Sequence, residues 1–274
     1  MIFDFSNYGE LLPLVTNSLI AAVLLGLAGG LIGIFVMTRD MSFAVHGISE
    51  LSFAGASVAL LIGFDVVAGS VAGSLVAALI IAVLGTRAKD RNSIIAVLMP
   101  FGLGLGILAL SLYPGRASNK FGLLTGQIVS VSETSLEWLA AISILVILTL
   151  AVIWRPLSFS SLDPEVAKAR GVKTGPLAII FLVLLGLAVA ASVQVVGALL
   201  VLSLLVTPAA AALRVTSSPK LAPVLSVAFA LTAAVGGILL ALGGGLPISP
   251  YITSVSFAIY LVCRGIAYAR KVRP

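Results

Sequence analysis

A histidine and a glutamate four residues apart form the pair in this sequence best suited to chemistry. His46, the only histidine of the chain, precedes Glu50 inside the segment 41–56, which otherwise holds apolar residues, glycine and serine. On a helix this spacing places the imidazole and the carboxylate on one face, one turn apart. An ionisable group at membrane depth costs roughly 2.5 kcal/mol or more to insert. Two such groups on one face therefore predict a cation site or a proton pathway.

Each of these residues also has a purely structural interpretation. His46 can be satisfied by a neighbouring helix, and Glu50 can be a protonated carboxyl group in a polar pocket. Ser49 and Ser52 flank the carboxylate and could donate hydrogen bonds, but serine in a spanning helix usually serves packing. From the residues alone, the ligand and the structural interpretations of the pair stay open.

The composition predicts that the elements around this pair are membrane-spanning helices. Hydrophobic residues make up 60% of the 274 positions and charged residues 9%, whereas a soluble domain carries about 25% charge. The sequence shows no alternating polarity typical of barrel strands, so we expect the chain to cross the membrane as helices. The net charge of +6 lies in short loops and does not indicate a nucleic-acid surface. The single cysteine, Cys263, excludes an internal disulfide framework.

We expect a single all-α transmembrane domain over residues 1–274, with about nine spans and eight as the alternative. The least certain division is at Ser192–Val196, where Gln194 is the only strong break in a continuous apolar run. That break is compatible with a tight hairpin or with a helix interrupted at depth. The predicted spans are 14–37, 41–62, 66–86, 93–113, 136–154, 177–192, 194–213, 222–243 and 250–268.

The positions of the basic residues predict the orientation. Short loops rich in lysine and arginine stay on the cytoplasmic side. With the N-terminus outside and the C-terminus in the cytoplasm, all of the 16 basic residues except Arg116 and Lys120 fall inside. A chain of eight simple spans would place both ends on one side and lose this pattern.

Residues 162–171 predict a short helix on the cytoplasmic side, within a longer loop at 156–176. Asp163 is suited to the N-cap, Pro164 to the first helical position and Glu165 to the positive end of the dipole. Gly171 can end the helix in the left-handed conformation. This element is either an ordinary surface helix or a docking site for a partner. No phosphate-binding G-x-x-x-x-G-K-[ST] motif occurs, so any ATPase would be a separate chain.

Segments along nearly the whole chain resemble the permease subunits of bacterial zinc and manganese ABC importers. The 162–171 loop and the following segment 195–212 are similar to that family's loop and glycine- and proline-containing helix. Further similar segments occur in the same order at 39–55, 90–106, 124–128 and 246–260. The resemblance implies a docking surface for an ATPase that includes Asp163, Pro164, Glu165, Ala167 and Gly171.

One departure from the family pattern concerns the pair itself. The family commonly has an aspartate and a histidine four residues apart, whereas here His46 takes the acidic position and Glu50 the histidine position. Asp40 also replaces the second basic residue of that stretch. The exchange keeps one imidazole and one carboxylate, a donor set that suits Zn²⁺, Mn²⁺ or Fe²⁺. We therefore predict His46 and Glu50 as metal ligands and leave the choice of metal open.

The resemblance implies a non-catalytic permease subunit, in a bacterial cell membrane, of an ATP-driven importer of a divalent transition metal. The expected partners are a second copy of the chain, ATPase subunits and an extracytoplasmic metal-binding protein, with the metal as substrate and no permanent cofactor. The main alternative is a proton-coupled secondary carrier that acts without an ATPase. A siderophore or cobalamin permease is a lesser one. One histidine cannot form the H-E-x-x-H site of an intramembrane metalloprotease.

Overall fold

The described part of the chain is helical. The structure is a computed structural model that describes residues 8–85, 88–115, 131–198, 201–243 and 248–272, and these ranges contain no strand. A helix satisfies its backbone hydrogen bonds within one segment, as apolar runs of this length in lipid require. The all-α fold class is confirmed. In chain order the helices are α1 (Tyr8–Leu11), η1 (Leu12–Val15), α2 (Thr16–Thr38), α3 (Ser42–Ile62), α4 (Val66–Leu84), α5 (Ala88–Leu112), α7 (Glu133–Leu162), α8 (Pro164–Ala169), α9 (Thr174–Val196), α10 (Val201–Leu205), α11 (Thr207–Val215), α12 (Leu221–Leu242) and α13 (Ile248–Val272).

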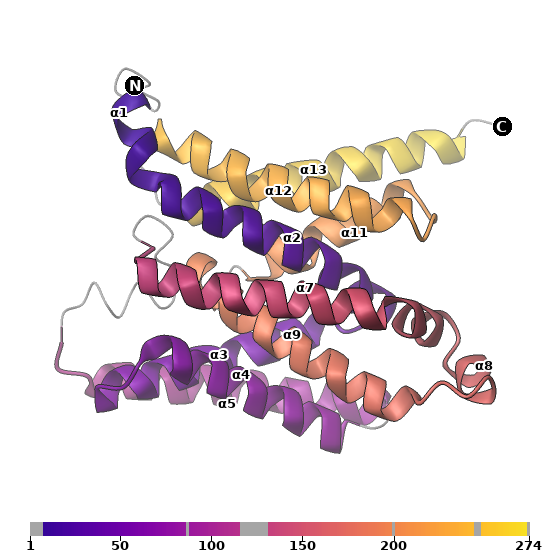
Figure 1. The fold of residues 1–274 in the computed structure, drawn as a ribbon, viewed down its shortest axis with the longest axis horizontal. Coiled ribbons are helices and arrows are strands. Elements are labelled where there is room, and N and C mark those ends of the chain that lie inside the picture. Colours follow the sequence, from indigo (N-terminus) through magenta and orange to yellow (C-terminus); the bar gives the residue numbers. More distant parts are fainter. Residues whose placement is uncertain (1–7, 86–87, 116–130, 199–200, 244–247, 273–274) are drawn as a thin grey trace.

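Eight helices in the described ranges are long and apolar enough to cross a membrane. They are α2 together with η1, then α3, α4, α5, α7, α9, α12 and α13. Figure 1 shows these helices lying roughly side by side, with α8 at one end of the bundle and α1 at the opposite end. The count matches the alternative of eight rather than nine. The difference arises between α9 and α12.

The segment 194–213, expected as one long helix, is instead divided into the end of α9 and two short helices. α9 continues through the predicted break at 192–196, and the Ser192 hydroxyl donates to the carbonyl one turn earlier at 2.8 Å. The helix ends at Gly197, whose φ of 88° is readily adopted only by glycine. Two short helices, α10 and α11, follow, and Pro208 lies in the first turn of α11, where a missing amide hydrogen is tolerated. The break therefore lies just beyond the predicted position.

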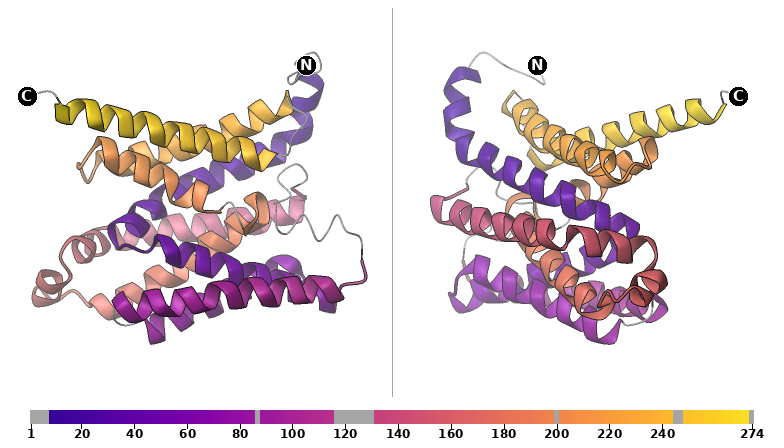
Figure 2. Two further views of the ribbon diagram at one scale, coloured as in Figure 1. Left: turned by 180° about the vertical axis from the view of Figure 1, so that it is seen from behind. Right: turned by 45° about the vertical axis from the view of Figure 1, so that its right-hand side comes forward.

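The described ends of the chain lie at opposite ends of the bundle. α1 is at one end, and the C-terminal end of α13 is at the other, where α8 also lies (Figures 1 and 2). Eight full-length passages would return the chain to the end where it began. Together, α10 and α11 carry the chain from one end of the bundle back to the other. The described ends of the chain therefore lie at opposite ends, as the charge pattern predicted for an odd number of crossings.

The helices pack in two groups that α7 connects. α3, α4 and α5 contact one another and α4 contacts α9, whereas α2, α11, α12 and α13 form the second group. α7 contacts both α2 and α9. Small residues permit this packing: a Cβ atom on Gly30 of α2 would lie 2.7 Å from the Cα atom of Val227 in α12. Glycine at such positions lets two helices approach closely in lipid.

Basic side chains gather at the end of the bundle where α8 lies. Arg39, in the turn between α2 and α3, hydrogen-bonds two serines near the end of α7. Arg39 and Arg91 line one cavity, while Arg155 and Lys220 line a second groove. This distribution agrees with the predicted clustering of bases in loops of one side. The predictions for Arg116, Lys120 and segment 124–128 fall outside the described residues.

Candidate functional site

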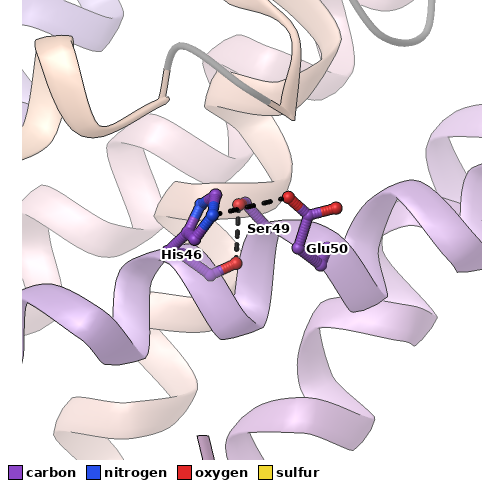
Figure 3. Close-up of polar contacts among 3 residues, drawn as sticks. All are labelled: His46, Ser49 and Glu50. Carbon is purple, nitrogen blue, oxygen red and sulfur yellow. Dashed lines mark hydrogen bonds and ion pairs between the residues drawn. The ribbon is translucent and has the colours of Figure 1, made fainter. Parts of the chain in front are cut away.

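The structure brings His46 and Glu50 together on one side of α3. Their side chains lie one turn apart, with His46 Nε2 3.7 Å from Glu50 Oε1 (Figure 3). At a rise of 1.5 Å per residue, Glu50 is about 12 Å along α3 from its first turn. The carboxylate is thus well inside the spanning helix. The predicted shared face is present.

The pair runs from a partly open imidazole to a buried carboxylate. The His46 side chain is 26% exposed and the Glu50 side chain 3%. Within the part of the chain that the structure describes, His46 Nδ1 and Glu50 Oε2 are buried and have no hydrogen-bond partner. A buried polar atom without a partner is costly and calls for an explanation. Each side chain thus has a polar atom without a partner in the described part of the protein, which is typical of a site that binds a ligand.

Two glycines hold the turn of α3 that carries Glu50. A Cβ atom on Gly102 of α5 would lie 2.9 Å from the Glu50 carbonyl carbon and 3.0 Å from the Leu51 nitrogen. A Cβ atom on Gly73 of α4 would overlap the Leu51 carbonyl oxygen. Both neighbouring helices therefore reach the backbone of α3 at this turn only because these positions lack a side chain. The close approach fixes the height and rotation at which α3 presents its pair.

The neighbouring serines have packing roles. The Ser49 hydroxyl donates to the His46 carbonyl at 2.8 Å (Figure 3). The Ser52 hydroxyl donates to the Ser70 carbonyl of α4 at 3.1 Å and lies 2.7 Å from the Ser70 hydroxyl. Both hydroxyls are thus engaged away from the Glu50 carboxylate, and the packing interpretation of these serines is confirmed.

The geometry of the pair allows both side chains to bind one ion. The 3.7 Å between His46 Nε2 and Glu50 Oε1 exceeds the roughly 2.7–3.2 Å of a good hydrogen bond. Two donors about 2.1 Å from a shared ion at a tetrahedral angle lie about 3.4 Å apart. A shift of a few tenths of an ångström would let both donate to the same cation. Across the described ranges, no group of three or more His, Cys, Asp or Glu side chains is placed to hold a metal.

The short helix α8 has the local structure that the sequence predicted. The Asp163 carboxylate accepts from two backbone amides of the first turn, at 3.1 and 3.0 Å, and Pro164 occupies the first helical position. Glu165 is exposed at this positive end, and Ala167 is fully buried against the bundle. Gly171 follows the helix with a φ of 85°. α8 is therefore a capped, anchored element that lies at the end of the bundle (Figure 1).

Other singled-out residues lie away from the pair in sequence. Gln194, near the end of α9, is half-buried, and its Nε2 atom has no hydrogen-bond partner among the described residues. Cys263 is buried in α13 as a free thiol. The sequence analysis did not identify the cavity lined by Arg39 and Arg91, because no spacing rule connects two arginines in different loops. Their shared position at the cytoplasmic ends of predicted spans was the only available signal.

Comparisons with known proteins agree with this architecture. A family model described as the ABC 3 transport family matches residues 12–266. The manganese transport system membrane protein MntC of Halalkalibacterium halodurans is 30% identical over 81% of this chain and 76% of its own length. The manganese import system permease protein ScaB of Streptococcus gordonii is 29% identical over 90% of this chain and 88% of its own length.

A solved structure has the same fold. A chain of PsaBC from Streptococcus pneumoniae, in complex with a Fab, superposes with a TM-score of 0.83 at 26% identity, covering 93% of this chain and 95% of that one. The region matched by the family model, residues 12–266, includes the site helix α3, the helices α10 and α11, and the capped helix α8. The chain therefore belongs to the ABC 3 transport family and is a multi-span membrane permease.

Proposed function

We propose that this permease imports a divalent transition metal, with Mn²⁺ as the first candidate and Zn²⁺ or Fe²⁺ as the others. The observation that carries the proposal is the pair of half-buried His46 and buried Glu50 within one spanning helix, where His46 Nδ1 and Glu50 Oε2 have no hydrogen-bond partner among the described residues. Mixed imidazole and carboxylate donors suit these metals. The names of the relatives MntC and ScaB, which are manganese systems, favour manganese among them.

The pair is suited to passing an ion rather than keeping it. It supplies two ligands, whereas a stable site takes four or more. A ligating histidine is usually fixed by a hydrogen bond on its other ring nitrogen, and His46 Nδ1 lacks one in the described part of the chain. Weak, incomplete ligation lets the ion leave. A second copy of the chain would add a second pair and complete a pathway between two permeases.

The energy for import is assigned to separate ATPase subunits that dock on the loop 156–176. Support comes from α8, which is capped by Asp163, anchored through Ala167 and placed at one end of the bundle. Pro164, Glu165 and Gly171 complete the surface proposed for docking. The opposite end, where α1 lies, would receive metal from an extracytoplasmic binding protein. This orientation places the N-terminus outside and the C-terminus in the cytoplasm of a bacterial cell.

The test is metal uptake by cells with and without the chain, combined with capture of its partner. Uptake of Mn²⁺, Zn²⁺ and Fe²⁺ is measured with and without an uncoupler, and a tagged chain is purified to recover an ATPase subunit. We expect manganese uptake that survives the uncoupler while ATP is supplied, together with a captured ATPase. Uptake that collapses with the uncoupler, with no ATPase captured, would instead support the proton-coupled carrier.

A further inference from the structure

A cavity of about 670 Å³ opens at the α8 end of the bundle, separate from the His46–Glu50 pair. Its walls come from the turn between α2 and α3, the end of α4, the start of α5 and the first turns of α9. These elements belong to different parts of the sequence and meet only in the folded chain. The cavity therefore has a defined shape that the fold itself maintains.

Two arginines give this cavity a strong positive charge. Arg91 Nη2 lies 3.4 Å from the Arg39 carbonyl oxygen, and both side chains line the cavity. Arg91 Nε is buried and has no hydrogen-bond partner among the described residues. Burial, with a smaller effect of the nearby Arg91, lowers the pKa of Arg39. Two positive side chains that line one partly buried cavity repel each other, and an anion bound in the cavity would offset that repulsion.

No carboxylate of the described lining neutralises this pair. Asp40 and Asp90 are neighbours of the two arginines in sequence, but both side chains are exposed. In the described ranges, the one contact between a basic and an acidic side chain joins His46 and Glu50, away from this cavity. Among the described residues, none therefore supplies the compensating negative charge, which a bound anion would provide.

The uncapped start of α9 adds to the attraction for an anion. Gly175 and Ala178 of its first turns line the cavity, and the N-cap residue Lys173 makes no side-chain hydrogen bond to the helix. The free amides at the start of a helix this long attract negative charge. The cavity thus combines two guanidinium groups with a helix N-terminus.

The remaining wall of the cavity is aliphatic. Ile81, Ala82 and Leu182 line it together with Ile179 and Ile180, which are 46% and 41% exposed. All five belong to helices of spanning length. A free inorganic anion would gain nothing from contact with this apolar surface, whereas the glycerol backbone and first methylenes of a lipid would bury it.

We infer that this cavity binds an anionic phospholipid of the cytoplasmic leaflet. The phosphodiester headgroup lies between Arg39 and Arg91, and the start of an acyl chain lies along the isoleucine wall. Basic pockets between spanning helices on the cytoplasmic side are suited to such headgroups.

The position of the lipid gives it a structural role. Arg39 donates to the Ser160 and Ser161 hydroxyls at 2.6 and 2.8 Å, just before α8, and lies 5.3 Å over the Phe181 ring of α9. The same turn leads three residues later into α3, the helix with His46 and Glu50. A lipid that neutralises the arginine pair therefore stabilises the turn that joins the site helix to the base of α8.

The inference is tested by lipid titration of the purified full-length chain. Native mass spectrometry and thermal unfolding are followed with phosphatidylglycerol, with phosphatidylcholine of the same acyl chains, and with inorganic phosphate. We expect preferential binding and stabilisation by phosphatidylglycerol, reduced by about fivefold in affinity by Arg91→Gln. Arg91→Lys, which keeps the charge, should retain most of the preference. Ala82→Leu fills the cavity while leaving both arginines and should weaken binding as Arg91→Gln does.

The matched control is Arg155→Gln, which removes one positive charge from the other groove at the same end. It should leave the preference intact. Equal binding of the two lipids, an unchanged preference in Arg91→Gln and Ala82→Leu, or loss only in Arg155→Gln would overturn the inference. Stabilisation by millimolar phosphate equal to that by phosphatidylglycerol would also overturn it, because the site would then bind a free anion.

Discussion

At the scale of the residue, Glu50 is placed where stability alone would not place a carboxylate. Its side chain is 3% exposed, Oε2 has no hydrogen-bond partner within the described ranges, and the His46 imidazole lies 3.7 Å from Oε1. Burying an acid with so little compensation works against folding. A residue kept under these conditions is expected to serve transport at a cost in stability.

Replacing the buried carboxyl group, as in Glu50→Gln, should therefore not destabilise the fold. The amide has the shape of the acid and cannot ionise, so the desolvation penalty falls. We expect the free energy of unfolding to stay unchanged or to rise by about 1 kcal/mol, measured by thermal unfolding of the purified chain. The control is Glu165→Gln, an exposed position on α8 that should change stability by less than about 0.5 kcal/mol. A loss of stability in Glu50→Gln well beyond that control would contradict the argument.

At the scale of the element, the glycines of α4 and α5 set the position of α3. Sequence alone does not show which backbone each of these glycines meets in the fold. Gly102 meets the Glu50 turn, whereas a Cβ atom on Gly104, two residues further along α5, would have no atom within 4 Å. The two positions therefore provide a matched comparison in one helix.

We predict that Gly102→Ala and Gly104→Ala differ in effect. The new methyl group at position 102 would force α5 away from α3 and should cost about 1–3 kcal/mol of stability, together with reduced metal uptake. Gly104→Ala should be neutral or slightly stabilising, because alanine favours a helix. Thermal unfolding and an uptake assay measure both. Equal effects of the two substitutions would show that the contact at Glu50 does not position α3.

The helix α8 could be predicted residue by residue, because its determinants are local. A cap, a proline and a terminal glycine act within a few positions, and the structure has each of them in place. The end of α9 was predicted less well. Hydropathy marks Gln194 as the break, but the backbone turns at Gly197, where the required φ is positive.

The cap of α8 leads to a further prediction. Asp163→Ala removes the acceptor for two amides and should cost about 1 kcal/mol of local helix stability. We expect faster amide exchange in α8 and weaker capture of the ATPase subunit by the tagged chain. Ser132→Ala is the matched control, since Ser132 caps the other end of α7. Capture that is weakened equally by both substitutions would argue against docking on α8.

At the scale of the whole molecule, the sequence predicted the class of fold and the gathering of basic residues at one end. These features follow from composition and from loop charges, which need no tertiary information. The replacement of a ninth long helix by α10 and α11 did not follow from hydropathy, because both short helices are apolar. Their shortness depends on contacts with α2, α3 and α13 that only the folded chain supplies.

The proposed orientation is tested by cysteine labelling in a Cys263→Ala background. Phe64→Cys lies between α3 and α4 at an exposed position, and Lys168→Cys lies on the exposed side of α8. An impermeant maleimide should label Phe64→Cys in intact cells, and Lys168→Cys only after permeabilisation, because the proposed orientation places the basic loops in the cytoplasm. The reverse pattern would show that the chain is inserted with α8 outside.

The most direct measurement of the central claim is ATP-driven Mn²⁺ uptake into vesicles that contain the chain and its ATPase partner. His46→Ala and Glu50→Ala are compared with Ser49→Ala, which alters the same turn but removes only a hydroxyl bonded to the backbone. If the pair ligates the transported metal, each of the first two substitutions lowers uptake by at least about tenfold, while Ser49→Ala stays near the wild-type rate. Wild-type uptake in both His46→Ala and Glu50→Ala would contradict this ligation.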